Sequence, residues 1–212
     1  MIELPDLPRW VEAHGIAADP EHWRTPLGGG FALGHDAAKL IVIAGDADRQ
    51  ALAGLARAYP QHTLLVEKPD MVDRPTERAI LHTLPDSEAM PELEGAVLLD
   101  DATPLPDSLA DELAWAKRRG PVFTVYLDGT PAAFAYAPWR SEKLFDVSVD
   151  TVIGARQLGL ATVVSAAMIR HELAQGRAPV WGADEGNVAS LRLAARLGFV
   201  AVDEIWVAAC AR

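Results

Sequence analysis

The feature that most constrains the fold of this chain is the order of its predicted elements after Gly120. Two apolar runs, 122–126 and 132–137, flank Asp128-Gly129, a dipeptide typical of the tight turn between antiparallel strands. Residues 144–152 alternate apolar and polar side chains, as expected of a strand with one buried face. The patterns that follow predict a helix over 162–175, a strand from 179, a helix ending at 197 and a strand over 199–208. The C-terminal half is therefore expected to have the order βββαβαβ.

The front of the chain gives shorter signals of the same α/β kind. Strand, helix, strand and strand are predicted over 39–45, 47–59, 62–67 and 78–84. A helix over 108–119 is expected to begin at Asp107 or Ser108 as its N-cap and to end at Gly120. Two regions are therefore predicted, an N-terminal α/β region over 1–115 and a C-terminal core over 116–212.

Two segments near the N-terminus could be considered as nucleotide-binding loops, but neither has the required residues. Gly28, Gly29 and Gly30 are not followed by Lys-Ser/Thr and do not complete Gly-x-Gly-x-x-Gly, so we expect a flexible loop there. The apolar run 41–45 lacks the glycines and the lysine that phosphate binding requires. A duplicated, degenerate half-domain is an alternative for the front, because 39–67 has the order strand, helix, strand; no sequence repeat supports it.

Charge and residue usage disfavour several classes of function. The formal net charge is −11, which opposes binding to the phosphate backbone of a nucleic acid. Glu3 and Asp6 stand where a secretory signal would be basic, and no apolar run approaches the ~20 residues of a membrane span. We therefore expect a cytoplasmic protein with neither nucleic-acid nor membrane partners. Cys210 is the only cysteine and the six histidines show no ligand spacing, so we expect no disulfide and no metal site.

The loop over 151–162 has the composition of an anion-binding turn. It joins the alternating strand to a helix, and the N–H groups at a helix start lack intrahelical acceptors and lie at the positive end of the dipole. Gly159 and Ala161 let the backbone approach a ligand closely, and Arg156 adds a positive charge. These residues alone fit either phosphate binding or an ordinary helix entry.

Two motifs of the C-terminal half resemble those of the GNAT superfamily of acyl-CoA N-acyltransferases. Motif A, Arg/Gln-x-x-Gly-x-Gly/Ala, is matched by Arg156, Gly159 and Ala161. Motif B, Asn-x-x-Ser/Ala followed by Leu-Gly-Phe, is matched by Asn187, Ser190, Leu197, Gly198 and Phe199. Both motifs occur in the family's order on the expected elements, and the resemblance does not extend to residues 1–75.

The resemblance implies an α/β (α+β) fold with a mixed, splayed central sheet flanked by helices and an N-terminal α/β extension. The core over 116–212 would hold acetyl-CoA between the strand 144–152 and the strand that starts at 179. Main-chain groups of Val149, Thr151 and Val152 would pair with pantetheine. The pyrophosphate would be held by the loop residues Arg156, Gln157, Leu158, Gly159, Leu160, Ala161 and Thr162. Asn187 and Ser190 would reach the cofactor from the last helix, although a role as N-cap explains Asn187 equally well.

The activity that the resemblance implies is transfer of an acetyl group from acetyl-CoA to an amine of an unidentified acceptor. A general base would remove a proton from the attacking amine. Asp146 is the first candidate for this base, Glu142 the second and Asp150 the third, and each also fits a solvated carboxylate on a strand face. A main-chain N–H within 149–151 would stabilise the oxyanion.

One departure from the family pattern leaves a second function open. Many members carry a Tyr seven residues after the motif B Asn as general acid, and this chain has Ala194 there. A non-catalytic acyl-CoA-binding or regulatory module of the same fold is therefore the alternative. Trp181 and Trp139 fit either an acceptor pocket or the core. An edge strand after Gly198 would allow a homodimer.

Overall fold

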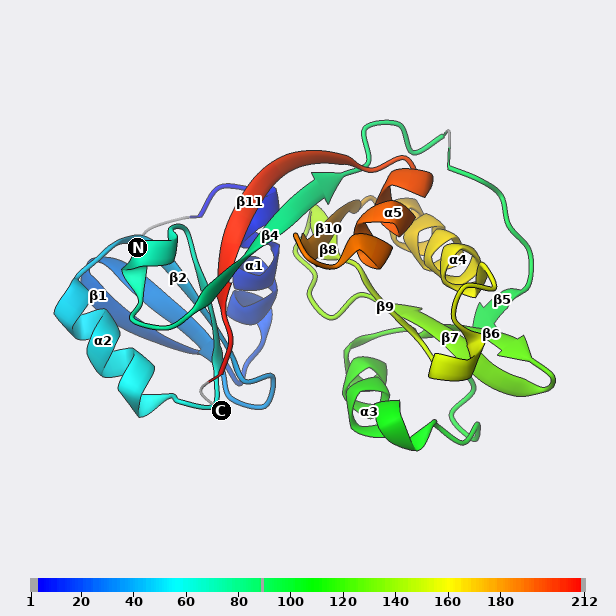
Figure 1. Ribbon diagram of the computed structural model, residues 1–212, viewed down its shortest axis with the longest axis horizontal. Helices are drawn as coiled ribbons and strands as arrows, with labels where there is room; N and C mark the ends of the chain where they lie inside the picture. The colour runs from blue at the N-terminus through cyan, green and yellow to red at the C-terminus, as the bar shows by residue number, and fades with distance from the viewer. Residues whose placement is uncertain (1–3, 89, 211–212) are drawn as a thin grey trace.

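The computed structural model describes residues 4–88 and 90–210 and shows two lobes joined by a pair of long strands (Figure 1). The N-terminal lobe contains α1 (Val11–Ala18), β1 (Trp23–His35), β2 (Leu40–Ala47), α2 (Arg49–Ala58) and β3 (Thr63–Val66). The C-terminal lobe contains β5 (Ala96–Leu98), α3 (Ala110–Arg119), β6 (Phe123–Leu127), β7 (Thr130–Tyr136), β8 (Leu144–Asp146), β9 (Ser148–Thr151), α4 (Leu160–Ala174), β10 (Ala178–Asp184) and α5 (Val188–Arg196). The joining strands are β4 (Thr76–Thr83) and β11 (Val200–Ala208). Short 3-10 turns occur at η1 (Pro8–Trp10), η2 (Pro69–Met71), η3 (Asp107–Leu109) and η4 (Ile153–Ala155).

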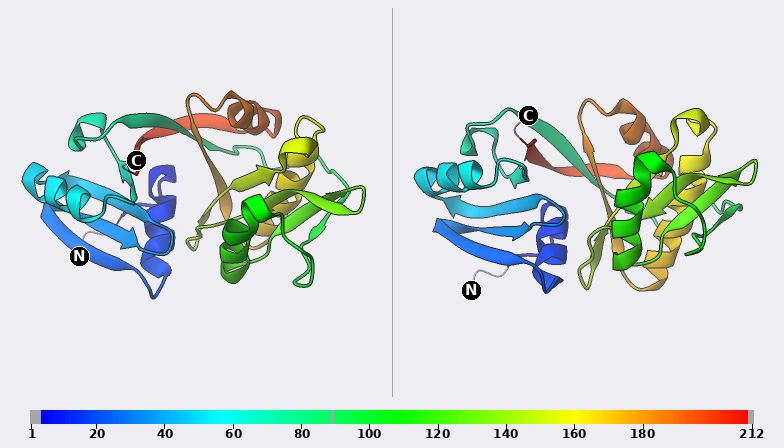
Figure 2. Two further views of the ribbon diagram at one scale, coloured as in Figure 1. Left: turned by 60° about the horizontal axis from the view of Figure 1, so that its bottom comes forward. Right: turned by 90° about the horizontal axis from the view of Figure 1, so that it is seen from below.

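The strands β4 and β11 make each lobe depend on a distant part of the chain. They pair with each other in antiparallel fashion within a mixed sheet of order β1-β2-β3-β11-β4-β10-β8. β11, from the end of the chain, pairs with β3 of the N-terminal lobe, whereas β4 pairs with β10 of the C-terminal lobe. Figure 1 and the turned views in Figure 2 show both strands spanning the space between the lobes. Shared main-chain hydrogen bonds therefore set the position of one lobe relative to the other.

The strand predicted over 144–152 is divided into two, which corrects the prediction of a single strand. β8 runs parallel to β10 in the large sheet, whereas β9 pairs with β7 in a second sheet of order β5-β6-β7-β9. The division occurs at Val147, between the two short strands. A strand that leaves its neighbour in this way produces the mixed, splayed sheet flanked by helices that the resemblance implied.

Most of the other predicted elements are confirmed, with small differences at their ends. The order βββαβαβ after Gly120 is observed once β8 and β9 are taken together. The hairpin between β6 and β7 has φ of 51° at Asp128 and 77° at Gly129. Two successive left-handed residues are typical of the tight turn whose twist matches that of the flanking strands. Local turn chemistry therefore determined this part of the fold.

Two further predictions are wrong, and a third is wrong for part of a strand. Gly28, Gly29 and Gly30 lie in β1 rather than in a flexible loop, because β1 and β2 approach too closely for side chains: a Cβ at Gly30 would lie 2.5 Å from the carbonyl oxygen of Ala44. Neither Asp107 nor Ser108 caps α3, because Asp107–Leu109 form a 3-10 turn and the helix begins after Leu109. The strand after Gly198 is an edge strand only in part: β11 pairs with β4 over Val200–Ala208, but with β3 only over Trp206–Ala208.

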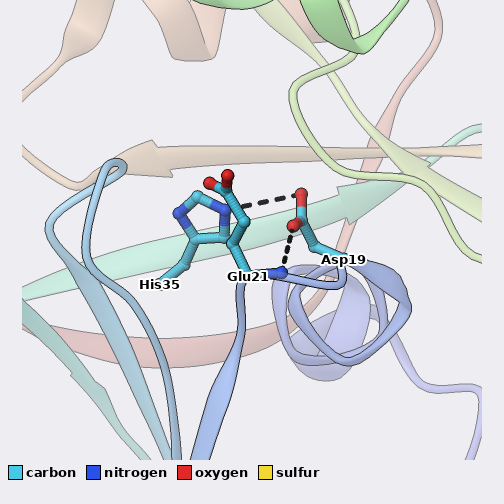
Figure 3. Close-up of side chains that lie close together, drawn as sticks. All are labelled: Asp19, Glu21 and His35. Atoms are coloured by element: carbon cyan, nitrogen blue, oxygen red, sulfur yellow. Dashed lines mark hydrogen bonds and ion pairs between the residues drawn. The ribbon is translucent and has the colours of Figure 1, made fainter.

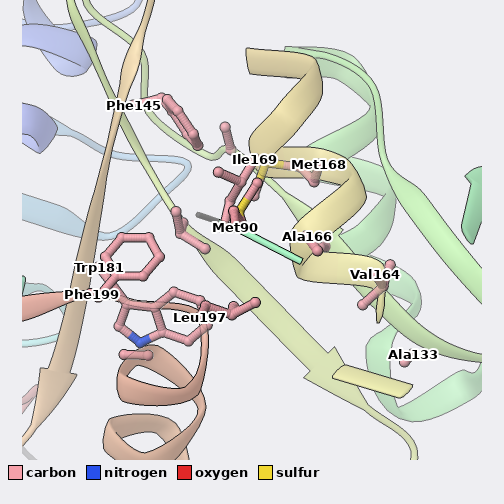
Figure 4. Packing of buried hydrophobic residues seen from close by; sticks show 14 of the residues in the cluster. Met90, Ala133, Phe145, Val164, Ala166, Met168, Ile169, Trp181, Leu197 and Phe199 are labelled. Atoms are coloured by element: carbon pink, nitrogen blue, oxygen red, sulfur yellow. The ribbon is translucent and has the colours of Figure 1, made fainter. Parts of the chain in front are cut away.

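The largest core cluster lies in the C-terminal lobe between α4, α5 and the sheets (Figure 4). Trp181 is 1% exposed and packs its ring edgewise against Phe199, with ring centroids 5.4 Å apart. Trp139 is also buried and belongs to the core beside α1. Of the two alternatives for these tryptophans, the structure selects the core.

Within the described part of the chain, the helices are too short or too polar to cross a bilayer.

The short strand β5 belongs to the C-terminal sheet although it precedes residue 115. It pairs antiparallel with β6, and the polypeptide between them contains α3. The 85–106 segment, which carries several prolines, therefore contributes a strand that the sequence did not predict. The boundary between regions 1–115 and 116–212 stays a prediction.

Candidate functional site

The centre of the candidate site is the point at which β9 separates from β10. In the paired part, Asp146 of β8 lies opposite Val180 of β10. The N–H of Val147 still donates to the carbonyl of Val180 at 3.0 Å, and β9 then pairs with β7. Because β9 is the last strand of its sheet, the main-chain polar groups on its outer side face the opening.

The loop after β9 leads to the N-terminus of α4 at the mouth of this opening. Gln157 and Gly159 adopt left-handed conformations, with φ of 66° and 82°. Gly159 is the N-cap of α4, and among the described residues no side chain caps this helix. The first-turn N–H groups of Leu160 and Ala161 have no intrahelical acceptor by their position. This end of a 15-residue helix is therefore available to an anion.

The remaining loop side chains are exposed around that helix end. Arg156 is exposed, and its Nε donates to the carbonyl of Thr151 at 3.4 Å, which keeps the guanidinium beside the loop. Ile153 is 82% exposed and Leu158 is 57% exposed. An anionic ligand with an apolar arm would find both a positive charge and apolar side chains here.

A pocket of about 250 Å³ adjoins the separation of the strands and is lined by both lobes. Its lining residues are Glu12, Leu65, Ala79, Leu81, Asp146, Val147, Ser148, Gly182, Ala183, Asp184, Asn187, Ile205 and Val207. The first belongs to α1, and the others belong to β3, β4, β8 to β11 and the segments that adjoin them. Because β4 and β11 run between the lobes, residues of α1 and β3 in the N-terminal lobe lie beside the opening in the C-terminal lobe.

Two carboxyl groups in this pocket have raised pKa values. Burial raises the pKa of Asp146 to about 7, against a smaller opposing effect of the Val147 N–H. Burial, followed by the neighbouring charge of Asp146, raises the pKa of Glu12 to about 8. The pair therefore retains a proton near neutral pH, and Asp146 has a pKa suited to general-base catalysis. Sequence reasoning missed Glu12, because α1 carries no recognisable motif.

The other two candidate bases lie outside this pocket. Glu142 is exposed in the turn before β8 and is not among the lining residues. Asp150 is engaged on the α3 side of the sheet: the Tyr136 hydroxyl lies 3.0 Å from its carboxyl group and 2.6 Å from that of Glu112. One hydroxyl proton cannot serve two carboxylates, and burial followed by the charge of Glu112 raises the pKa of Asp150. Of the three candidates, Asp146 alone lines this pocket, and its role as the base stays a prediction.

The sequence of this region matches a known family. A family model described as GNAT acetyltransferase matches residues 115–207. Residues 115–207 form a GNAT acetyltransferase domain. Acyl transfer is the general activity that this membership supports. No curated protein matches the chain.

Solved structures with the GNAT fold match both lobes. A GNAT-family protein from Novosphingobium aromaticivorans is 23% identical, with a TM-score of 0.67 and coverage of 95% of each chain. A GCN5-related N-acetyltransferase from Kribbella flavida is 15% identical, with a TM-score of 0.66 over 94% of this chain and 93% of that one. A tandem GNAT protein from the clavulanic acid biosynthesis pathway is 16% identical, with a TM-score of 0.54 over 94% and 93% of the two chains. At these identities the matches show a shared fold.

The motif B residues of the GNAT domain form hydrogen bonds and core contacts within the domain itself. Asn187 is the N-cap of α5: its Oδ1 accepts from the N–H of Ser190 at 3.1 Å, and the residue also lines the pocket. The hydroxyl of Ser190 accepts from Nε1 of the buried Trp181 at 2.9 Å. Ala194 is fully buried in the core cluster. These contacts stabilise the domain, and cofactor contacts of Asn187 and Ser190 stay predictions.

Outside the GNAT domain, three side chains have the composition of a metal site (Figure 3). Ligand atoms of Asp19, Glu21 and His35 lie within 4.8 Å of one another. However, Nδ1 of His35 accepts from the N–H of Ala38 at 3.2 Å, so in the neutral ring Nε2 carries the proton and cannot bind a metal. Nε2 lies 3.4 Å from Asp19, which also accepts from Arg119 of α3 at 2.5 Å. The cluster therefore fits an ion-pair junction between the lobes.

Proposed function

We propose that the protein is an N-acetyltransferase that transfers the acetyl group of acetyl-CoA to an amine acceptor. The observation that carries this proposal is the arrangement of the uncapped α4 N-terminus, the free edge of β9 and the pocket with Asp146 along one opening. Membership of residues 115–207 in the GNAT family supports the same assignment.

The opening provides separate places for the parts of the donor. The amides from Gln157 to Thr162 at the start of α4, with Arg156 beside them, would bind the pyrophosphate. The outer edge of β9 has main-chain N–H and C=O groups free to pair with the pantetheine amides as an added strand would. Val149 and Thr151 are the main-chain positions of β9 on this path. Val152 does not suit this role, because its N–H already donates to the carbonyl of Ala132 at 2.9 Å and its carbonyl accepts from the N–H of Ala155 at 2.9 Å. The thioester would then lie near Val147, beside the pocket.

The acceptor amine would meet the thioester at Asp146. As its carboxylate takes a proton from the ammonium, the neutral nitrogen attacks the acetyl carbonyl, and a main-chain N–H of β9 stabilises the oxyanion. Collapse forms the amide, breaks the carbon–sulfur bond and releases the coenzyme A thiolate, while the nitrogen loses its second proton to water. Ala194 has no proton to donate, so the thiolate is protonated by water or another group.

The first experiment is calorimetric titration of acetyl-CoA into the protein and into Ala161→Glu. Ala161 lies in the first turn of α4, where a glutamate suits the helix dipole but repels a pyrophosphate. We expect at least about tenfold weaker binding by this variant. Ala161→Gln, of equal size and without the charge, is the matched control and should bind far better than Ala161→Glu. No binding by the unchanged protein would contradict the proposal.

The alternative is a non-catalytic acyl-CoA-binding or regulatory module of the same fold. The observation that favours it is the buried Ala194 at the place where many members carry the catalytic Tyr. The two functions differ in turnover. Binding of acetyl-CoA without acetylation of any amine in a broad panel would favour the module over the enzyme.

A further inference from the structure

The helix α1 packs closely enough on the GNAT domain to bring Glu12 into its pocket. α1 lies against β8 and β1. At Gly15 a Cβ would lie 2.7 Å from the Cβ of Trp139, so only glycine allows this approach. Glu12 is three residues earlier and therefore lies on the same side of the helix, one turn away. α1 therefore packs against the segment before β8, and Glu12 lines the pocket beside Asp146.

The lining of this pocket selects for a cation with an apolar body. Among the described residues that line it, three carry carboxyl groups, Glu12, Asp146 and Asp184, and none is Lys, Arg or His. The wall contributed by β3, β4 and β11 is apolar and consists of Leu65, Ala79, Leu81, Ile205 and Val207. A ligand with a carboxylate or phosphate would meet like charges without a compensating cation.

The two inner carboxyl groups lack a counter-ion of their own. Across the described part of the chain, no basic side chain forms an ion pair with Glu12 or Asp146. The guanidinium on the adjoining turn η1 is engaged with other carboxylates. That group, Arg9, donates to Asp203 at 2.7 Å and lies 3.7 Å from Glu67. Both side chains are half-buried, and loss of contact with water raises the pKa of each carboxyl group, with the charge of Asp146 as a second cause at Glu12. An ammonium group between them would offset that loss.

We propose that Glu12 is a second acceptor-binding carboxylate, and that the acceptor is a primary alkylamine with an apolar body and without an anionic group. The N-terminal lobe then supplies a specificity-determining residue to the GNAT domain. This inference rests on the proposed N-acetyltransferase function. Glu12 holds the ammonium, and Asp146 takes the proton from it.

The test compares two acceptors of equal chain length, butylamine and 4-aminobutyrate, with saturating acetyl-CoA. The unchanged protein should acetylate butylamine with at least about tenfold higher kcat/KM. Glu12→Gln, which keeps the size of the side chain, should raise KM for butylamine about tenfold with a smaller change in kcat. Glu12→Asp keeps the charge and should restore part of the affinity. Glu94→Gln, an exposed acid outside the pocket, is the control and should behave like the unchanged protein.

A second measurement does not depend on turnover. Calorimetry of butylamine binding at about pH 7.5, in two buffers of different ionisation enthalpy, counts the protons released. The unchanged protein should release a proton on binding, and Glu12→Gln should release markedly less.

The outcomes separate the two proposals. Absent acetyl-CoA binding, or absent acetylation of every amine, would remove the N-acetyltransferase function, and the butylamine calorimetry would still test the pocket. An unchanged KM in Glu12→Gln, equal use of 4-aminobutyrate, or no binding of butylamine would overturn the role of Glu12, even in an active acetyltransferase.

Discussion

Replacing Glu172 with Gln should destabilise the base of the opening between β9 and β10. Glu172 lies on α4, is 1% exposed, and accepts hydrogen bonds from Nε of Arg140 at 2.9 Å and Nε of Arg177 at 2.8 Å. Arg140 precedes β8 and Arg177 precedes β10, so one carboxylate holds the starts of both parallel strands. The substitution leaves two guanidinium groups facing a neutral amide.

Removing one partner of a buried ion pair typically costs about 3–5 kcal/mol, because the remaining charge stays away from water. The two arginine side chains are 18% and 24% exposed, so water solvates part of their charge. We therefore expect the lower end, about 3 kcal/mol of unfolding free energy, or a fall in Tm of about 6–12 °C.

Urea denaturation at neutral pH, followed by far-UV circular dichroism, measures this change. Glu204→Gln is the control, because Glu204 pairs with Arg78 at 3.2 Å on the surface and should contribute less than about 1 kcal/mol. If Glu172→Gln also costs less than about 1 kcal/mol, the reasoning about the buried carboxylate is refuted.

Three other predictions follow from single residues. In the unchanged protein, kcat/KM for the amine should rise with pH through about 7 as Asp146 loses its proton, and Asp146→Asn should lower it by about 10²–10⁴; a flat pH profile would contradict this assignment. Because the folded-state pKa of Glu12 is raised from 4.5 to about 8, its contribution to stability is present at low pH and is lost as pH rises through about 8. Thermal denaturation should therefore show that Glu12→Gln loses less stability than the unchanged protein between about pH 5 and 9. Gly30→Ala should destabilise by about 1–3 kcal/mol, because its Cβ would lie 2.5 Å from the Ala44 carbonyl; an unchanged Tm would show that β1 and β2 can adjust.

Agreement between sequence and structure is best where a local signal was sufficient. The left-handed Asp128-Gly129 turn, the N-cap at Asn187 and the apolar run of β2 each depend on neighbours within a few residues. The prediction failed at Gly28–Gly30, because the reason for glycine there is the facing strand β2 and not the local chain. It failed at α3 because a 3-10 turn precedes that helix and displaces its start from the expected cap.

The candidate site shows the same division. Asp146 and the motif A loop could be recognised from residue type, spacing and position between a strand and a helix. Sequence ranked Asp146 ahead of Asp150 but could not exclude Asp150, because both belong to the polar face of one predicted strand. Only the contact of Asp150 with Tyr136 and the lining of the pocket separate them.

By itself, the sequence determined the order of the elements after Gly120 and the loop that enters α4, because periodicity, capping and the φ preference of glycine act over a few residues. Tertiary structure alone decided three features: the division of the predicted strand at Val147, the exchange of β4 and β11 between lobes, and the place of Glu12 beside Asp146. Each of these depends on pairing or packing between residues far apart in the chain. Such contacts are determined by the free energy of the whole fold and leave no local pattern.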